Sequence, residues 1–123
     1  MPSPLRTSAT AEPRGCWHDG DLPLVESLLL DLATGERFER LGVIAREHLA
    51  TGGKRLRARL ALATMQALGG DRREAVPWAA AAEMLHNATL VHDDLQDGDA
   101  VRRGHPAVWA RHGANQAINV GDL

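Results

Sequence analysis

An acidic cluster in the second half of the chain is the feature whose residue types and spacing are most suited to chemistry. Asp93 and Asp97 lie four residues apart, and Asp94 lies three residues before Asp97. On an α-helix, Asp93 and Asp97 share one face and Asp94 lies at its flank, so the three carboxylates are expected to converge on one small volume. Like charges this close are unfavourable unless a cation or a proton neutralises them. Oxygen ligands at this density suit Mg²⁺, so the cluster predicts a metal bridge to a diphosphate.

The alternative is that this cluster is the solvated acidic end of a helix, which would be the better interpretation of a lone pair of aspartates. However, the C-terminal end of a helix already carries a partial negative charge, so acidic residues there destabilise the helix when no cation is bound. A sequence that keeps such a cluster near suitable partners is typical of a functional site. Two groups of cations in the chain provide such partners.

A glycine turn followed by basic residues precedes the third predicted helix. Gly52 and Gly53 are followed by Lys54, Arg55 and Arg57, at a helix start whose free backbone N–H groups favour anions. Lys54 can act as a point charge, and Arg57 can bind two oxygens with its guanidinium. A basic helix start without a ligand would be preferred if this stretch stood alone, but the only lysine of the chain falls here. The segment therefore predicts a binding site for a diphosphate.

A second cationic pair, Arg102 and Arg103, follows the acidic cluster. It can neutralise the carboxylates, and a structural ion pair with Asp97 or Asp99 is the alternative to binding phosphate. His86 lies two helical turns before the cluster on nearly the same face and can donate a hydrogen bond to phosphate. A satisfied core histidine is equally compatible with the spacing of His86.

The spacing of apolar residues predicts the helices that must position these groups. Apolar side chains recur at intervals of three and four residues in the first two runs. The third run is rich in Ala and Leu and closes at Gly69 and Gly70, and the fourth starts near Pro77, which is acceptable in the first turn of a helix. The predicted helices cover residues 22–35, 38–49, 56–68 and about 77–97. Residues 99–106 are expected to form a loop, followed by a short helix around Trp109 and a further helix that begins near Ala117. Because strand signals are weak and no alternating apolar run is present, the predicted fold class is all-α.

Composition restricts the class of protein. A chain of 123 residues, 44% of them hydrophobic, can form one small domain with one core. The net charge of −2 offers no broad basic surface, which argues against a nucleic-acid partner. The single cysteine, Cys16, excludes a disulfide framework and favours a cytoplasmic location. Without a long apolar stretch, no membrane span is expected, and residues 1–20 are expected to form a disordered tail.

Four segments together resemble the N-terminal portion of the trans-isoprenyl diphosphate synthase (polyprenyl synthetase) family, whose members join prenyl units head to tail. The segments are Gly-Gly-Lys-Arg-Leu-Arg at 52–57, Glu-Met-Leu-His-Asn-Ala-Thr-Leu-Val-His-Asp-Asp-Leu-Gln-Asp at 83–97, Arg-Arg-Gly-His-Pro-Ala-Val-Trp at 102–109 and Ala-Ile-Asn-Val-Gly-Asp at 117–122. Class I terpene cyclases share the bare Asp-Asp-x-x-Asp pattern but lack the Gly-Gly-Lys and Arg-Arg-Gly segments. The resemblance implies a partial α-helical bundle of the isoprenoid synthase type over residues 21–123.

The resemblance also implies a function in isoprenoid biosynthesis and the roles of the candidate residues. Mg²⁺ ions that bridge the allylic diphosphate would be held by Asp93, Asp94 and Asp97, with Arg102 on the same ligand. The diphosphate of isopentenyl diphosphate would be bound by Lys54, Arg57, His86 and Arg103. In the implied prenyl transfer the allylic diphosphate departs, the isopentenyl double bond attacks the allylic cation, and a proton is lost. Ala58 replaces a proline that is common in the family, and this puts no ligand in doubt.

Three residues just before the acidic cluster are implied to bound the growing product. They are Leu85, Ala88 and Thr89, and none of them is aromatic. In the family, bulky aromatic residues at this place give short products. The resemblance therefore implies a product of geranylgeranyl length or longer.

The length of the chain qualifies the implied function. Family members are longer and carry a second aspartate-rich motif in a half that this chain lacks, so the metal site is expected to be half-built, with apolar faces exposed where the other helices would pack. Three alternatives follow: an inactive fragment, one subunit of a heteromeric synthase, or a non-catalytic diphosphate-binding or modulatory subunit. A homodimer or a complementing subunit is the expected assembly. A histidine-aspartate phosphohydrolase, suggested by His92 and Asp93, would need further spaced histidines.

Overall fold

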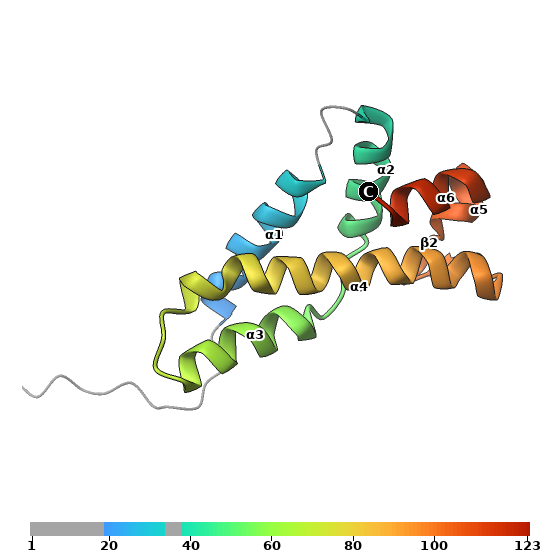
Figure 1. Cartoon of the computed structure of the whole chain (residues 1–123). Helices are drawn as coiled ribbons and strands as arrows, with labels where there is room; N and C mark the ends of the chain where they lie inside the picture. Colours follow the sequence, from blue (N-terminus) through green and yellow to red (C-terminus); the bar gives the residue numbers. More distant parts are fainter. Residues whose placement is uncertain (1–18, 34–37) are drawn as a thin grey trace, which may run out of the picture.

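The computed structural model describes residues 19–33 and 38–123, and this part of the chain is built almost entirely from α-helices (Figure 1). The elements in chain order are η1 Asp19–Asp21, α1 Leu22–Leu32, α2 Glu39–Ala50, α3 Leu56–Ala67, η2 Arg72–Ala75, α4 Val76–Asp97, β1 Val101–Arg102, β2 His105–Pro106, α5 Val108–His112 and α6 Ala114–Gly121. The predicted all-α class is confirmed. The predicted tail over residues 1–20 lies almost wholly outside the described residues.

The four long predicted helices are all present as α1 to α4, and on α1 and α2 apolar residues that share one face are buried. Val25 and Leu29 on α1 are fully buried, as the spacing of one helical turn predicts. Ile44 and Leu49 on α2 are likewise buried, whereas Phe38, which the pattern placed on the same face, precedes α2 and is 54% exposed. The predicted end of the first helix at Gly35 falls outside the described residues.

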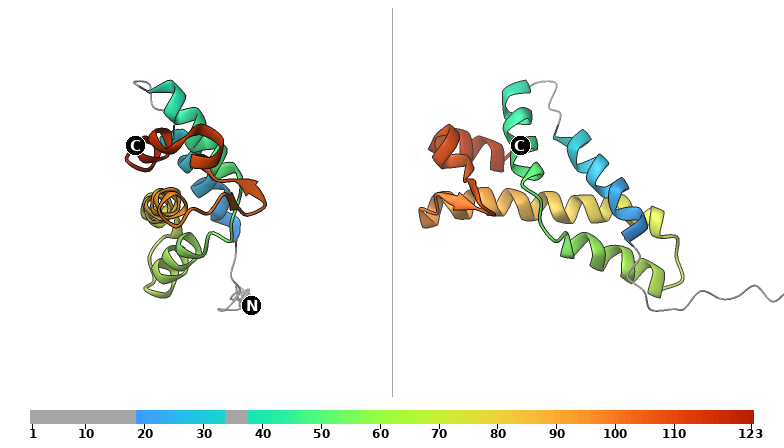
Figure 2. Two further views of the ribbon diagram at one scale, coloured as in Figure 1. Left: turned by 90° about the vertical axis from the view of Figure 1, so that its right-hand side faces the viewer. Right: turned by 180° about the vertical axis from the view of Figure 1, so that it is seen from behind.

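Helix α4 is the central helix, and the other helices pack against it. Figure 1 and the view from behind in Figure 2 show it running along the molecule, with α1 and α3 beside its first half and α2, α5 and α6 beside its second half. Its first half contributes Val76, Ala79 and Ala80 to a core shared with α1 and α3. Its second half contributes Val91 to another core shared with α2, α5 and α6. Burial at both ends therefore fixes the direction of the helix that carries the acidic cluster.

A short hairpin replaces the loop that was predicted between α4 and α5. Strands β1 and β2 pair antiparallel, with Val101 opposite Pro106 and Arg102 opposite His105. The two-residue turn between them consists of Arg103, with φ +52°, and Gly104, with φ +77°. Positive φ at both turn positions matches the twist of a tight hairpin. Strands of two residues are too short to produce an alternating pattern, so they could not be predicted from apolar spacing.

The outward faces of α3 and α4 carry large apolar side chains. Leu56 and Leu60 on α3 are 63% and 59% exposed, and Trp78 and Leu85 on α4 are 72% and 69% exposed. Exposed apolar groups this large are typical of a surface that packs against another element. No helix in the described ranges combines the length and the apolar content that a membrane span needs.

Candidate functional site

The acidic cluster occupies the last turn and a half of α4, but its three carboxylates do not face the same way. Asp93 and Asp97 are exposed, whereas Asp94 is only 1% exposed. The helix ends at Gly98, which has φ +73° and donates its backbone N–H to the carbonyl of Asp94. The left-handed conformation at Gly98 is the usual helix ending for a glycine. The chain therefore leaves α4 immediately after Asp97 and turns back towards Asp94.

Arg102 on strand β1 binds the buried carboxylate of Asp94. Its Nε lies 2.7 Å from Oδ1 and 2.8 Å from Oδ2 of Asp94, and its Nη2 lies 2.5 Å from Oδ1. The hydrogen bond to Asp94 raises the pKa of Arg102. The ion pair expected as the structural alternative thus exists, but with Asp94 rather than with Asp97 or Asp99.

This ion pair changes the expected metal site. In the part of the chain that the structure describes, no group of three or more carboxylate, imidazole or thiolate side chains is arranged to hold one ion. The expected convergence of all three aspartates is therefore not found, because the helix flank that carries Asp94 faces the hairpin. Asp93 and Asp97 remain as two exposed carboxylates one turn apart on α4. Two oxygen ligands suit Mg²⁺, which commonly completes its shell with water and substrate phosphates.

The cationic loop before α3 is anchored by Arg55. This residue is 4% exposed, and its Nε and Nη2 lie 2.5 and 3.1 Å from the two carboxylate oxygens of Glu26 on α1. Its Nη2 also donates to the carbonyl of Leu49 at 3.0 Å. Arg55 is therefore a structural anchor. Its neighbours Lys54 and Arg57 are both exposed and available to a ligand.

The start of α3 does not offer the free backbone N–H groups that the sequence suggested. Glu83 on α4 is 2% exposed, and its Oε1 accepts hydrogen bonds from the backbone N–H groups of Arg57 and Ala58 at 3.0 and 3.1 Å. A carboxylate here compensates the partial positive charge of the helix start. These two N–H groups are therefore not available to a diphosphate. Glu83 also ties the cationic loop to the helix that carries the acidic cluster.

Three of the four residues expected to bind isopentenyl diphosphate lie close enough to interact electrostatically. Burial lowers the pKa of His86, and the charges of Arg57 and Arg103 lower it further. Arg103 reaches the cationic loop from the hairpin, where its Nη1 donates to the carbonyl of Gly52. Burial and then the charge of Arg55 lower the pKa of Arg103. The fourth residue, Lys54, is exposed in the same loop. Side chains from α3, α4 and the hairpin thus gather in one region.

Of the residues expected to bound the product, Ala88 borders an apolar pocket. This pocket has a volume of about 270 Å³, and its lining includes Met84, Ala88 and Val91 from α4. Leu85 is 69% exposed, and Thr89 is exposed with its hydroxyl donating to the carbonyl of His86 at 2.7 Å. In this chain Leu85 and Thr89 therefore lie on the outer face of α4, away from the pocket.

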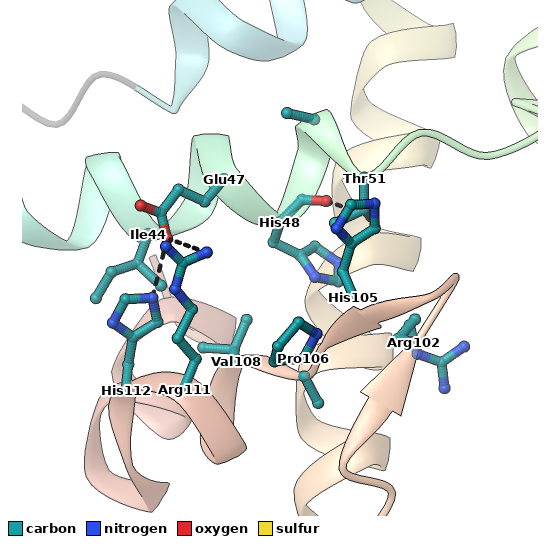
Figure 3. Close-up of a pocket in the computed structure, with 12 residues that line it drawn as sticks. Ile44, Glu47, His48, Thr51, Arg102, His105, Pro106, Val108, Arg111 and His112 are labelled. Carbon is teal, nitrogen blue, oxygen red and sulfur yellow. Dashed lines mark hydrogen bonds and ion pairs between the residues drawn. The ribbon is translucent and has the colours of Figure 1, made fainter.

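His48 on α2 is a buried polar residue near the site that sequence reasoning missed. It is 7% exposed, and its Nε2 has no hydrogen-bond partner in the described residues. Figure 3 shows His48 at the end of α2 facing the hairpin, beside a smaller pocket where Glu47 binds His112 at 3.0 Å and Arg111 at 3.6 Å. His48 lies four residues after Ile44 and three after Ala45, on the apolar face of α2, so this spacing was the signal that could have predicted its burial.

The buried His48 makes the stability of the fold depend on pH. Burial, aided by the charge of Arg103, lowers the pKa of His48 from 6.5 to about 4. Between these values the unfolded chain binds the proton more readily, so stability falls as the pH drops from 6.5 towards 4. The full effect corresponds to about 3 kcal/mol.

We expect this loss in urea unfolding curves recorded at pH 7 and at pH 4.5, and we expect His48→Gln to reduce the difference between the two pH values. The exposed His105, replaced in the same way, is the matched control. An equal pH dependence in His48→Gln and in the unmodified chain would contradict a buried neutral imidazole.

Comparison with known proteins places this geometry in a family. The family model for polyprenyl synthetase matches residues 39–123. The chain is 45% identical over 100 residues to a geranylgeranyl diphosphate synthase of Mycobacterium tuberculosis, a match that covers 80% of this chain and 29% of that protein. It is 51% identical over 76 residues to a geranylgeranyl diphosphate synthase of Saccharolobus solfataricus, covering 61% of this chain and 23% of that protein.

Solved structures show the same arrangement of helices. A geranylgeranyl pyrophosphate synthetase from Geoglobus acetivorans matches with a TM-score of 0.75 and 43% identity over 81% of this chain and 33% of that chain. A polyprenyl synthase from Caulobacter crescentus CB15, in complex with calcium and isoprenyl diphosphate, matches with a TM-score of 0.79 and 32% identity. That match covers 91% of this chain and 36% of that chain. The chain thus spans only about a third of the length of these structures.

Proposed function

The chain belongs to the polyprenyl synthetase family, and on this premise we propose that it takes part in head-to-tail prenyl transfer between isopentenyl diphosphate and an allylic diphosphate. One observation carries this proposal: consecutive hairpin residues reach two different charged regions. Arg102 binds Asp94 at the acidic end of α4, and Arg103 binds the loop that carries Lys54 and Arg57. The two adjacent arginines therefore bring an acidic region close to a cationic one. A reaction between two diphosphates needs two such neighbouring sites, one for each substrate.

The cationic region is the proposed site for the diphosphate of isopentenyl diphosphate. Lys54, Arg57 and Arg103 supply positive charge from two elements, and the two arginines can each bind two phosphate oxygens. His86 lies among these charges with a lowered pKa, so it is neutral at neutral pH and donates a single hydrogen bond. Because Glu83 already occupies the backbone groups at the start of α3, these side chains carry the binding.

The acidic region is the proposed site for the allylic diphosphate. Asp93 and Asp97 are its proposed Mg²⁺ ligands, since both are exposed and offer the oxygen atoms that this ion prefers. Bound Mg²⁺ would neutralise negative charge on the departing diphosphate. Asp94 orients Arg102 towards the same region rather than binding the ion directly. Arg102 thereby adds a fixed positive charge beside the leaving group.

The reaction that follows from these two sites forms one carbon–carbon bond. The carbon–oxygen bond of the allylic substrate breaks and leaves an allylic cation, which the double bond of isopentenyl diphosphate attacks. A proton then leaves the product for the released diphosphate. Water must be kept from the cation, and the apolar pocket beside Ala88 is where an apolar tail can be enclosed.

We propose that turnover needs more protein than these 123 residues, because the chain spans only part of its relatives. A longer product of the same gene, or a complementing subunit, would supply the missing ligands, and a dimer of this chain is a further assembly to test. The exposed apolar residues on α3 and α4 favour packing against additional helices. A non-catalytic or modulatory diphosphate-binding subunit is the second candidate, and the pairing of Asp94 with Arg102, which leaves two exposed aspartates for a metal ion, is the observation behind it.

A chimeric enzyme tests the proposed function. Residues 39–123 of this chain would replace the matching segment of the Geoglobus acetivorans synthase, and turnover of isopentenyl diphosphate with farnesyl diphosphate would be measured with Mg²⁺. We expect the chimera to turn over and the isolated chain not to. A folded but inactive chimera would contradict the catalytic proposal and favour the modulatory one. Turnover by the isolated chain would contradict its incompleteness.

Product length in the same chimera depends on Ala88. Replacing Ala88 with phenylalanine would fill part of the pocket of about 270 Å³, so we expect shorter products. The exposed Thr89, replaced in the same way, is the matched control and is expected to change product length less. Chromatography of the dephosphorylated products gives the result. An unchanged product length in Ala88→Phe would show that this pocket does not hold the growing chain.

A further inference from the structure

The turn of the hairpin holds Arg103 in an unusual backbone conformation. Among the described residues, Arg55 and Arg103 are the two non-glycine residues with positive φ, at +48° and +52°. Asparagine, aspartate or glycine usually occupies the first position of such a turn, because other side chains crowd the backbone there. Arg55 is held by Glu26. A strained conformation of this kind persists only where the surroundings impose it, so neighbouring residues must hold Arg103 in place.

The C-terminal end of α2 provides these interactions. Nη1 of Arg103 donates to the carbonyl of Gly52 and lies 3.4 Å from Oγ1 of Thr51. The hydroxyl of Thr51 itself donates to the carbonyl of His48 at 2.7 Å. Because its hydrogen is used in this way, the oxygen of Thr51 presents lone pairs as an acceptor. Figure 3 shows Thr51 beside His48 at this end of the helix.

The second glycine of the loop gives the guanidinium room. A Cβ atom on Gly53 would lie 2.9 Å from both Cζ and Nη2 of Arg103, closer than real side chains approach. Gly53 also has φ +134°, which L side chains rarely adopt. By contrast, a Cβ on Gly52 would meet nothing within 4 Å. Gly53 is therefore the position at which a side chain would displace Arg103.

The carbonyl of Gly52, the hydroxyl of Thr51 and the open space at Gly53 together form what we call the seat of Arg103. The charges around Arg103 explain why its guanidinium needs these contacts. Arg55 and Arg102 both lower its pKa, so its cationic neighbours repel it. The carbonyl of Gly52 and the hydroxyl of Thr51 offset this repulsion by binding one edge of the guanidinium. Both acceptors bind Nη1, and in the described part of the chain Nε and Nη2 have no protein acceptor. These free N–H groups are the ones that a phosphate could use.

We propose that Thr51 and Gly53 are positioning residues that seat Arg103 for binding the diphosphate of isopentenyl diphosphate. The identity of the ligand in this inference rests on the proposed function, whereas the seat of Arg103 does not depend on it. The seat orders Arg103 before the ligand arrives, so that binding does not have to immobilise a flexible side chain against neighbouring positive charges.

The test combines substitutions with calorimetric titration of isopentenyl diphosphate and of inorganic diphosphate. Thr51→Val keeps the shape of the side chain and removes the hydroxyl, and Gly53→Ala adds the obstructing methyl. We expect each to weaken binding about 5- to 10-fold, which corresponds to the loss of one hydrogen bond. Thr51→Ser restores the hydroxyl and is expected to bind within about twofold of the unmodified chain. Circular dichroism checks the folding of each variant.

A double-substitution cycle separates positioning from general loosening. Arg103→Gln should weaken binding, and adding Thr51→Val to it should produce no further loss, since Thr51 acts through Arg103. Binding by Thr51→Val equal to that of the unmodified chain would overturn the inference. So would an equal loss from Thr51→Val in the presence and absence of Arg103.

A measurement without ligand tests the seat separately from the proposed function. In ¹⁵N NMR of arginine-labelled protein, hydrogen bonding should slow rotation of the Arg103 guanidinium and give resolved Nη signals. We expect these signals to merge in Thr51→Val and in Gly53→Ala. Resolved signals without any diphosphate binding would contradict the proposed function and leave the seat standing. Merged signals in the unmodified chain would overturn the seat itself.

Discussion

Replacing Glu83 with alanine is expected to lower the free energy of unfolding by about 2–4 kcal/mol. Glu83 is 2% exposed, and its carboxylate accepts from two backbone N–H groups at the start of α3. Alanine would leave both groups without this acceptor, the buried N–H of Ala58 among them, and it would remove the negative charge that compensates the helix start. Urea unfolding followed by circular dichroism measures the loss.

Two controls make the Glu83 experiment specific. Glu83→Gln keeps an acceptor oxygen but removes the charge, so we expect a smaller loss of about 1 kcal/mol. Glu39→Ala removes an exposed carboxylate from the first turn of α2 and should cost no more than about 0.5 kcal/mol. If the Glu83→Ala chain were as stable as the Glu39→Ala chain, this would contradict the role of the Glu83 carboxylate as the acceptor at the start of α3.

Replacing both Asp93 and Asp97 with asparagine is expected to weaken Mg²⁺-dependent binding of farnesyl diphosphate by at least about 100-fold. The two residues are the exposed carboxylates of the acidic cluster and the proposed ligands of the ion. Because they lie in the last turns of α4, their removal also relieves repulsion with the helix dipole. We therefore expect the free energy of unfolding to stay constant or to rise by about 0.5 kcal/mol.

The neighbouring Asp94 should respond differently, because its carboxylate is buried and paired with Arg102. Asp94→Asn leaves Arg102 without its carboxylate partner, so we expect it to destabilise the fold by about 1–3 kcal/mol. Glu74→Gln, which changes one exposed carboxylate on η2, controls for net charge.

Retained Mg²⁺-dependent binding in the Asp93 and Asp97 double variant would show that these aspartates are not the metal ligands.

Helices α1 and α2 could be predicted from the sequence because each one buries a stripe of apolar side chains along a single face. Val25 and Leu29 on α1 and Ile44 and Leu49 on α2 illustrate this pattern. The hairpin could not be predicted, since its strands contain two residues each and its turn places an arginine where asparagine or glycine is usual. Its position matters, because it carries Arg102 and Arg103 to their partners.

The candidate site was predictable in its residues but not in their partners. Spacing on a helix placed Asp93, Asp94 and Asp97 within one turn, but it could not show that the flank bearing Asp94 faces Arg102. The helix start at Arg57 suggested free N–H groups, but Glu83 binds them from a helix 26 residues further along the chain. Such pairings depend on tertiary packing, and periodicity within a single helix carries no information about them.

The most direct test of the account is calorimetric titration of the 123-residue chain with each of two diphosphates, in the presence of Mg²⁺ and in the presence of a chelator. In the proposed arrangement, isopentenyl diphosphate lies among cationic side chains and the allylic diphosphate lies on carboxylates that need a metal ion. We therefore expect isopentenyl diphosphate to bind under both conditions and farnesyl diphosphate to bind only with Mg²⁺. Binding of farnesyl diphosphate in the presence of chelator, or no binding of isopentenyl diphosphate under either condition, would contradict this arrangement.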